Sequence, residues 1–143
     1  MRSYTFYSVL VICFVQVFTH DIPDELFDKV TLECMEKVHI DKEAVKNMIG
    51  ADYRITKGNP KISEQLECLG KAKHVVKEDD EFDRDVLYHE VMHTLLPLMN
   101  KGGADKHELA NKVTDECVTI KNDNFGERLI DLHNCFVDAV HKY

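Results

Sequence analysis

The chain has 143 residues with 26 acidic and 18 basic side chains, so its formal net charge at pH 7 is −8. An acidic chain without a stripe of basic residues repels the phosphate backbone, which excludes nucleic-acid binding as its function. The length suits one domain built around one hydrophobic core.

Residues 1–19 have the pattern of a secretory signal peptide. Arg2 supplies a positive start, residues 4–18 form an almost uncharged apolar run, and charged residues begin at Asp21. The run is too short to span a membrane and no second run follows it. We therefore expect a secreted, extracellular domain over residues 20–143, without membrane insertion. Loss of the leader removes one basic residue and takes the formal charge from −8 to −9.

Helical periodicity predicts three helices in the first half of the mature chain. The first spans residues 23–39, where apolar side chains recur every four positions. The second begins after Asp41, which can cap it, and Gly50 stops it. After a loop over 51–60, the third helix covers residues 60–76.

The second half predicts three more helices. The fourth begins near Phe82 after an acidic turn, and Pro97 bends or ends it. The fifth runs from Asp105 to Ile120, and the sixth covers residues 125–140. No stretch alternates long enough for a strand. We therefore predict an all-α fold, a compact orthogonal bundle of about six short helices around an internal apolar cavity.

Four of the five cysteines remain after Cys13 leaves with the leader. An even number in an exported chain indicates two disulfides, and counting leaves all three connectivities open. The remaining cysteines are separated by 33, 48 and 17 residues, whereas zinc sites usually use close pairs.

The segment from His89 to His93 reads H-E-x-x-H, a zinc metalloprotease motif. The extended form of that motif requires Gly and His where this chain has Leu96 and Met99. No sheet is predicted that could hold a substrate strand. We therefore expect Val91 and Met92 to face the core, with one histidine exposed and the other at its margin. We expect no catalytic residue, no metal ligand and no cofactor.

The leader, the acidic six-helix chain and the cysteine positions resemble the insect odorant-binding proteins, the family that includes pheromone-binding proteins. That family carries six cysteines. Cys68 resembles the third of them, the second would fall at Glu64, and the fifth would fall at Gly126. These two missing cysteines are partners in one bridge, so their loss leaves no orphan thiol. The chain is similar to the reduced, minus-C subgroup with four cysteines.

The resemblance implies that Cys34 pairs with Cys68, and Cys117 with Cys135. It also implies a looser contact between the third and sixth helices than in six-cysteine relatives. A Glu64→Cys, Gly126→Cys double variant would then raise stability, if the two backbones lie within disulfide reach.

The function that the resemblance implies is that of a carrier for small hydrophobic molecules such as odorants, pheromones or related lipids, and not an enzyme. Its partners would be the ligand and, in chemosensory lymph, a receptor. We expect a monomer or a weak dimer. The alternative is a secreted structural or interaction protein, for instance a gland or venom component on the same scaffold.

Apolar side chains from four of the predicted helices are expected to line the cavity, although their spacing would fit a solid core equally well. Three polar side chains are candidates to hold a ligand hydroxyl or carbonyl, namely Tyr53, Tyr88 and His133. The apolar candidates are Phe27, Val30, Val86, Leu87, Val91, Leu95, Leu109, Val113, Leu129, Leu132 and Phe136.

Overall fold

The computed structural model describes residues 22–143, so the signal peptide predicted over residues 1–19 lies outside the described residues. Within the described part, the chain is helical and contains no strand; extended segments pair only at two isolated bridges, Ile49 with Ile55 and Val76 with Phe82. The predicted all-α class is confirmed. No helix among the described residues combines the length and apolar character that crossing a bilayer requires.

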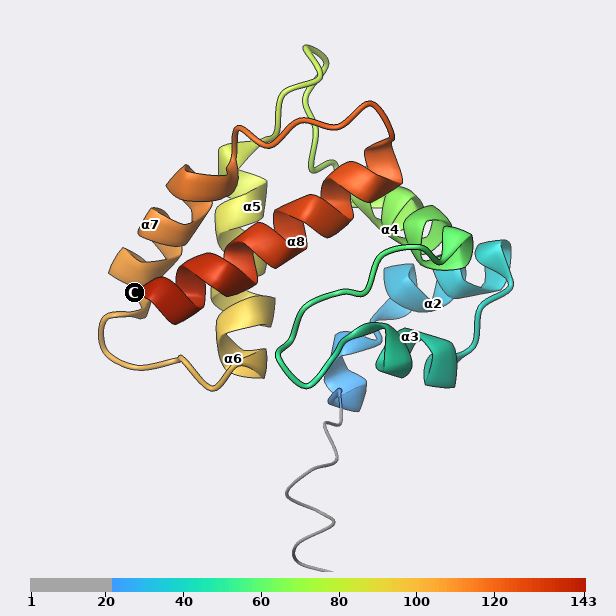
Figure 1. Cartoon of the computed structure of the whole chain (residues 1–143), viewed down its shortest axis with the longest axis horizontal. Helices are drawn as coiled ribbons and strands as arrows, with labels where there is room; N and C mark the ends of the chain where they lie inside the picture. The colour runs from blue at the N-terminus through green and yellow to red at the C-terminus, as the bar shows by residue number, and fades with distance from the viewer. Residues whose placement is uncertain (1–21) are drawn as a thin grey trace, which may run out of the picture.

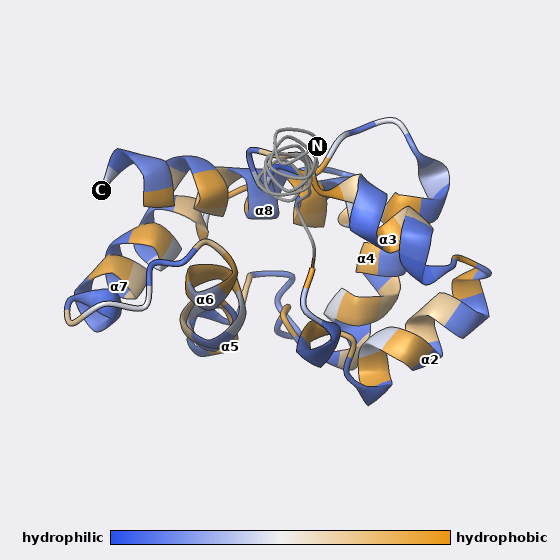
Figure 2. Ribbon diagram, turned by 90° about the horizontal axis from the view of Figure 1, so that it is seen from below, coloured by the Kyte–Doolittle hydropathy of each residue, from blue (hydrophilic) through white to orange (hydrophobic). Residues whose placement is uncertain are grey.

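Helix α8, the longest, lies across the others, with α2, α3 and α4 near one of its ends and α5, α6 and α7 near the other (Figure 1). Hydrophobic segments of α5, α6 and α8 face the interior, and hydrophilic segments lie mainly outside (Figure 2). The elements are η1 (Asp24–Leu26), α2 (Lys29–Val38), α3 (Lys42–Met48), α4 (Pro60–Ala72), α5 (Arg84–Glu90), η2 (Val91–Leu95), α6 (Leu96–Leu98), α7 (Lys106–Cys117) and α8 (Phe125–Lys142).

The predicted first helix over 23–39 is wrong at its start, because the chain breaks after a single 3-10 turn. Asp28 begins α2 by accepting a hydrogen bond from the Thr31 backbone N–H at 2.8 Å. This carboxylate satisfies a donor that the first turn of a helix leaves unpaired. The helix ends at His39, whose backbone adopts the left-handed conformation with φ of 61°.

Two other helices end earlier than periodicity predicted. Helix α4 stops at Ala72 rather than at 76, because His74 takes a positive φ of 55° and turns the chain. Val76 then pairs with Phe82 in an isolated bridge. Helix α7 ends at Cys117, before the predicted Ile120.

The predicted fourth helix ends close to Pro97, as expected, because α6 stops at Leu98. The helix widens into the π turn η2 just before the proline, where the Leu96 N–H donates to the carbonyl of Val91, five residues back. A proline ring crowds the carbonyl four residues before it, and a wider turn relieves that contact. Val91 and Met92 are buried as expected, but His89 and His93 are both exposed.

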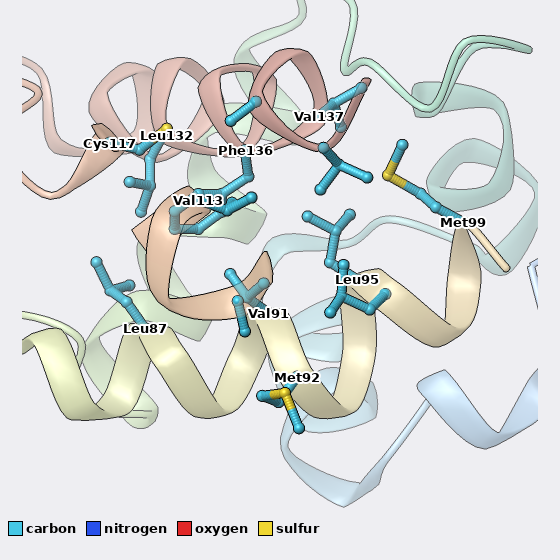
Figure 3. Close-up of a cluster of buried hydrophobic side chains, with 14 of the residues drawn as sticks. Leu87, Val91, Met92, Leu95, Met99, Val113, Cys117, Leu132, Phe136 and Val137 are labelled. Carbon is cyan, nitrogen blue, oxygen red and sulfur yellow. The ribbon is translucent and has the colours of Figure 1, made fainter. Parts of the chain in front are cut away.

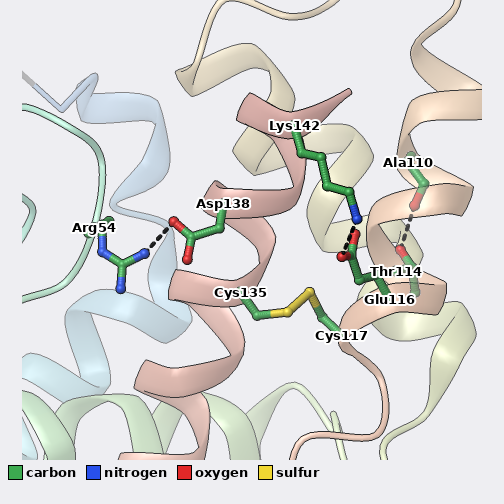
Figure 4. The surroundings of a disulfide bond; sticks show 8 residues. All are labelled: Arg54, Ala110, Thr114, Glu116, Cys117, Cys135, Asp138 and Lys142. Atoms are coloured by element: carbon green, nitrogen blue, oxygen red, sulfur yellow. Dashed lines mark hydrogen bonds and ion pairs between the residues drawn. A yellow bond between two sulfur atoms is a disulfide. The ribbon is translucent and has the colours of Figure 1, made fainter.

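Both disulfides implied by the resemblance are confirmed. The Cys34–Cys68 bridge joins α2 to α4, and the Cys117–Cys135 bridge joins α7 to α8 (Figure 4). Beside the second bridge, Leu87, Val91 and Leu95 project from one continuous helix toward Val113 and Phe136 (Figure 3).

Helices α4 and α8 are in close backbone contact at the position where a contact looser than in six-cysteine relatives was expected. A Cβ atom placed on Gly126 would lie 2.2 Å from Ser63 Oγ and 2.4 Å from the Ser63 carbonyl oxygen. The two backbones therefore touch, and Gly126 faces Ser63 instead of Glu64, which is exposed and pairs with Lys61. A cysteine at position 126 would collide with Ser63 before it could form a bridge.

Candidate ligand-binding site

A cavity of about 250 Å³ lies between α2, α3, α4, the continuous α5–α6 helix and α8. This volume is close to the lower end of the usual range for ligand pockets, about 300–1,000 Å³. Aliphatic side chains dominate its wall, and the polar side chains among its lining residues are Thr31, Gln65, Lys73, Glu90, Thr94 and His133.

Two helices supply opposite parts of the wall. The cavity-facing positions of the α5–α6 helix recur at intervals of three or four residues, which places them on one face of the helix. These residues are Leu87, Glu90, Val91, Thr94, Leu95 and Leu98. Helix α8 contributes Leu129, Leu132, His133 and Phe136, which share one face of the helix.

The loop between α3 and α4 supplies a further part of the wall through Ile55, and α8 holds this loop in place. The Asn134 side chain accepts from the Ile55 N–H at 2.8 Å and donates to the Ile55 carbonyl at 3.1 Å. Nearby, Arg54 of the loop forms an ion pair with Asp138 (Figure 4). Because Asn134 satisfies both backbone groups of Ile55, the loop needs no strand partner at this position.

His133, in the cavity wall, forms a further hydrogen bond to the same loop. Its Nε2 lies 2.7 Å from the Tyr53 carbonyl oxygen and must therefore donate, because a carbonyl can only accept. Burial lowers the pKa of His133 below its ordinary value of 6.5, and the charge of Arg54 lowers it further, although the bond to Tyr53 opposes both effects. The imidazole at this wall is therefore neutral at pH 7.

A His133→Gln variant should lose part of the pH dependence of stability. Because the folded-state pKa is depressed, the unfolded state takes up the proton first as the pH falls below about 6.5, and the free energy of unfolding decreases. Glutamine keeps an N–H donor but cannot titrate. Urea unfolding at pH 7.5 and at pH 5.5 should show a smaller difference in this variant than in the wild type. His141→Gln, at an exposed position, should keep the wild-type difference.

Charged side chains mark a place where the cavity meets solvent. Lys73 Nζ lies 3.3 Å from Glu90 Oε1 and 3.8 Å from Asp28 Oδ2. Both Lys73 and Glu90 line the cavity and are also partly exposed. The pair closes the edge of the cavity with groups that neutralise one another.

The structure brings most of the residues predicted from sequence to the cavity. Those that line it are Phe27, Leu87, Val91, Leu95, Leu129, Leu132, His133 and Phe136. The others do not line it. Val113 is fully buried in the core, and Val30, Val86 and Leu109 are half-buried outside the cavity. The Tyr88 hydroxyl is bonded to His107 Nδ1 at 2.8 Å, and the carbonyl of Tyr53 accepts the bond from His133.

Sequence reasoning missed the wall formed by α3, the following loop and α4. Leu66 and Leu69 share one face of α4, so their spacing could have indicated this wall. Gln65 could not be found in this way, because its polarity suggested an exposed position. The missed lining residues are Ile22, Leu26, Thr31, Val45, Met48, Ile49, Ile55, Gln65, Leu66, Leu69, Gly70, Lys73, Val75, Glu90, Thr94 and Leu98.

The H-E-x-x-H segment is not arranged around a metal position. The His89 and His93 rings stack with their centroids 5.6 Å apart, and Glu90 pairs with Lys73. Over residues 22–143, no group of three or more His, Cys, Asp or Glu side chains could hold a metal ion.

Comparison with known proteins identifies a family. The model of the PBP/GOBP family, the pheromone-binding and general odorant-binding proteins, matches residues 18–139. No curated protein and no solved structure matches the chain significantly. Because the family match includes every helix except the last turn of α8, the chain belongs to the PBP/GOBP family.

Proposed function

We propose that this protein is a secreted carrier that holds one small hydrophobic molecule in the cavity between α4, the α5–α6 helix and α8. Members of its family are small soluble carriers of odorants or pheromones, and they are binding proteins rather than enzymes. The leader pattern of residues 1–19 supports secretion. The four mature cysteines support membership of the minus-C subgroup.

The observation that carries this proposal is the apolar wall of the cavity. Transfer of apolar ligand surface from water into such a cavity is favourable by about 25 cal/mol per Å². The two rigid disulfides and the anchored Ile55 loop hold the wall in place before the ligand arrives. A preformed cavity reduces the ordering cost of binding, so a small ligand can bind without many polar contacts.

Partly filling the cavity should weaken binding. A fluorescent apolar probe such as aminoanthracene should bind the wild type and be displaced by small hydrophobic molecules. Leu69→Trp adds bulk to a half-buried residue of the cavity wall and should weaken probe binding at least tenfold. Leu109→Trp makes the same change at a half-buried residue outside the cavity and should leave binding nearly unchanged.

Equal loss of binding in both tryptophan variants would place the probe elsewhere, and no displaceable probe in the wild type would reject the carrier proposal. Mass spectrometry of the protein purified from its native tissue should detect a hydrophobic molecule that co-purifies with it.

A further inference from the structure

The polar side chains of the cavity wall differ in whether their hydrogen-bonding groups are already used. Lys73 and Glu90 pair with each other, and the Thr31 hydroxyl donates to Asp28 Oδ1 at 2.7 Å. The Nε2 of His133 donates to Tyr53. These contacts occupy the atoms named, and because Nε2 of His133 donates, its Nδ1 remains a hydrogen-bond acceptor.

Gln65 is different, because half of its amide is buried without a partner. The side chain is fully buried in the cavity wall, and its Nε2 donates to the Thr31 carbonyl at 3.3 Å. Across residues 22–143, the buried side-chain atoms without a hydrogen bond are Gln65 Oε1 and Arg128 Nη2, and Arg128 does not line the cavity. A buried carbonyl oxygen without a hydrogen bond destabilises the folded protein, because it has lost its bonds to water. A ligand that donates a hydrogen bond to it would remove this cost.

The orientation of the Gln65 amide follows from its neighbour. The Thr31 carbonyl can only accept, so the NH₂ group of Gln65 must face it and the oxygen must be the unpaired atom. The Cys34–Cys68 bridge lies three residues after each of these two positions, one helical turn along α2 and along α4. The bridge therefore fixes the two helices next to this contact and keeps the acceptor in place.

We propose that Gln65 Oε1 is the acceptor for a hydroxyl group of the ligand, so that the cavity selects alcohols or phenols over ethers, esters and hydrocarbons of the same size. This inference rests on the proposed carrier function. The oxygen is buried away from bulk solvent and Gln65 lines the cavity, so a molecule that enters the cavity can supply its partner. The partner must donate a proton, which a hydroxyl does and an ether or ester oxygen cannot. A carboxylate would meet the oxygen with a negative charge and no donor, and is disfavoured.

Octanol and its isomer heptyl methyl ether test this inference, because they have the same atoms and differ in the donor. Each is used to displace bound aminoanthracene from the full mature chain. The wild type should bind octanol about tenfold more tightly than the ether, since the ether leaves the Gln65 oxygen unpaired. Gln65→Met, which has a similar shape and no amide, should bring the ratio of the two affinities close to one.

Thr94→Val is the matched control, because it removes a different polar group from the same cavity and should keep the preference for octanol. A wild type that binds the isomers equally would overturn the inference, as expected if a buried water satisfies Gln65. A preference that persists in Gln65→Met, with a wild-type-like thermal transition, would also overturn it. Both results differ from failure of the carrier proposal, in which neither the probe nor the competitors bind.

Discussion

Removal of the Cys34–Cys68 bridge by a Cys34→Ala, Cys68→Ala double variant should lower the free energy of unfolding by about 4 kcal/mol. The bridge closes a loop with a sequence separation of 34 residues, and loop closure of this length removes about that much free energy from the unfolded chain. A domain of this size has about 5–15 kcal/mol of stability in total, so the loss is a large share of it. Urea unfolding followed by circular dichroism measures the change.

The matched control is a Cys117→Ala, Cys135→Ala variant, whose bridge spans 18 residues and should contribute about 3 kcal/mol. The two variants should differ more in binding than in stability. Only the Cys34–Cys68 bridge lies one turn from the contact between Gln65 and Thr31, so only its loss should reduce the preference for octanol over the ether. A stability loss below 1 kcal/mol in either variant would show that its bridge does not restrict the unfolded chain as loop closure predicts.

Apolar periodicity predicted the interior-facing sides of α5, α7 and α8, because each of these helices buries one continuous stripe. It failed where a local contact decides the end of a helix. The break before Asp28 depends on one side-chain cap, and the turn at His74 depends on a positive-φ backbone conformation that non-glycine residues seldom adopt. The π turn before Pro97 follows from crowding of a carbonyl, which apolar spacing does not record.

The cavity was predictable only in part for a related reason. Residues such as Leu87 and Phe136 lie on strongly apolar faces and were expected in its wall. The Ile55 loop reaches the cavity because Asn134 satisfies its backbone, a contact between positions 79 apart in sequence. The spacing of apolar residues in the sequence also could not distinguish cavity residues from core residues. Val91 lines the cavity, whereas Val113 is equally buried but does not line it.

The absence of two cysteines was interpreted as a missing constraint between α4 and α8, and it gave no indication that the two helices approach closely. Gly126 stands where a fifth cysteine would fall, and its lack of a side chain lets α8 rest directly on Ser63. The two helices are therefore in backbone contact at this position. Glycine allows such close approach at the cost of conformational freedom.

A Gly126→Ala variant should accordingly lose about 2–3 kcal/mol of stability, although alanine is the better helix former. The added methyl group would lie 2.2 Å from Ser63 Oγ and 2.8 Å from the Ser63 carbonyl carbon, so one helix must move. Because α8 carries Leu129 and Leu132 into the cavity wall, probe affinity should fall as well. Thermal and urea unfolding, together with probe titration, measure both effects.

Two further variants separate this contact from a general effect of alanine. Gly103→Ala places a methyl group where nothing lies within 4 Å, so stability should stay the same or rise slightly. Adding Ser63→Gly to Gly126→Ala removes the hydroxyl contact but leaves the Ser63 carbonyl oxygen 2.4 Å from the new methyl group, so recovery should be partial. Full recovery would mean that only the serine side chain is crowded, whereas an unchanged stability of Gly126→Ala itself would show that the two backbones are not in contact.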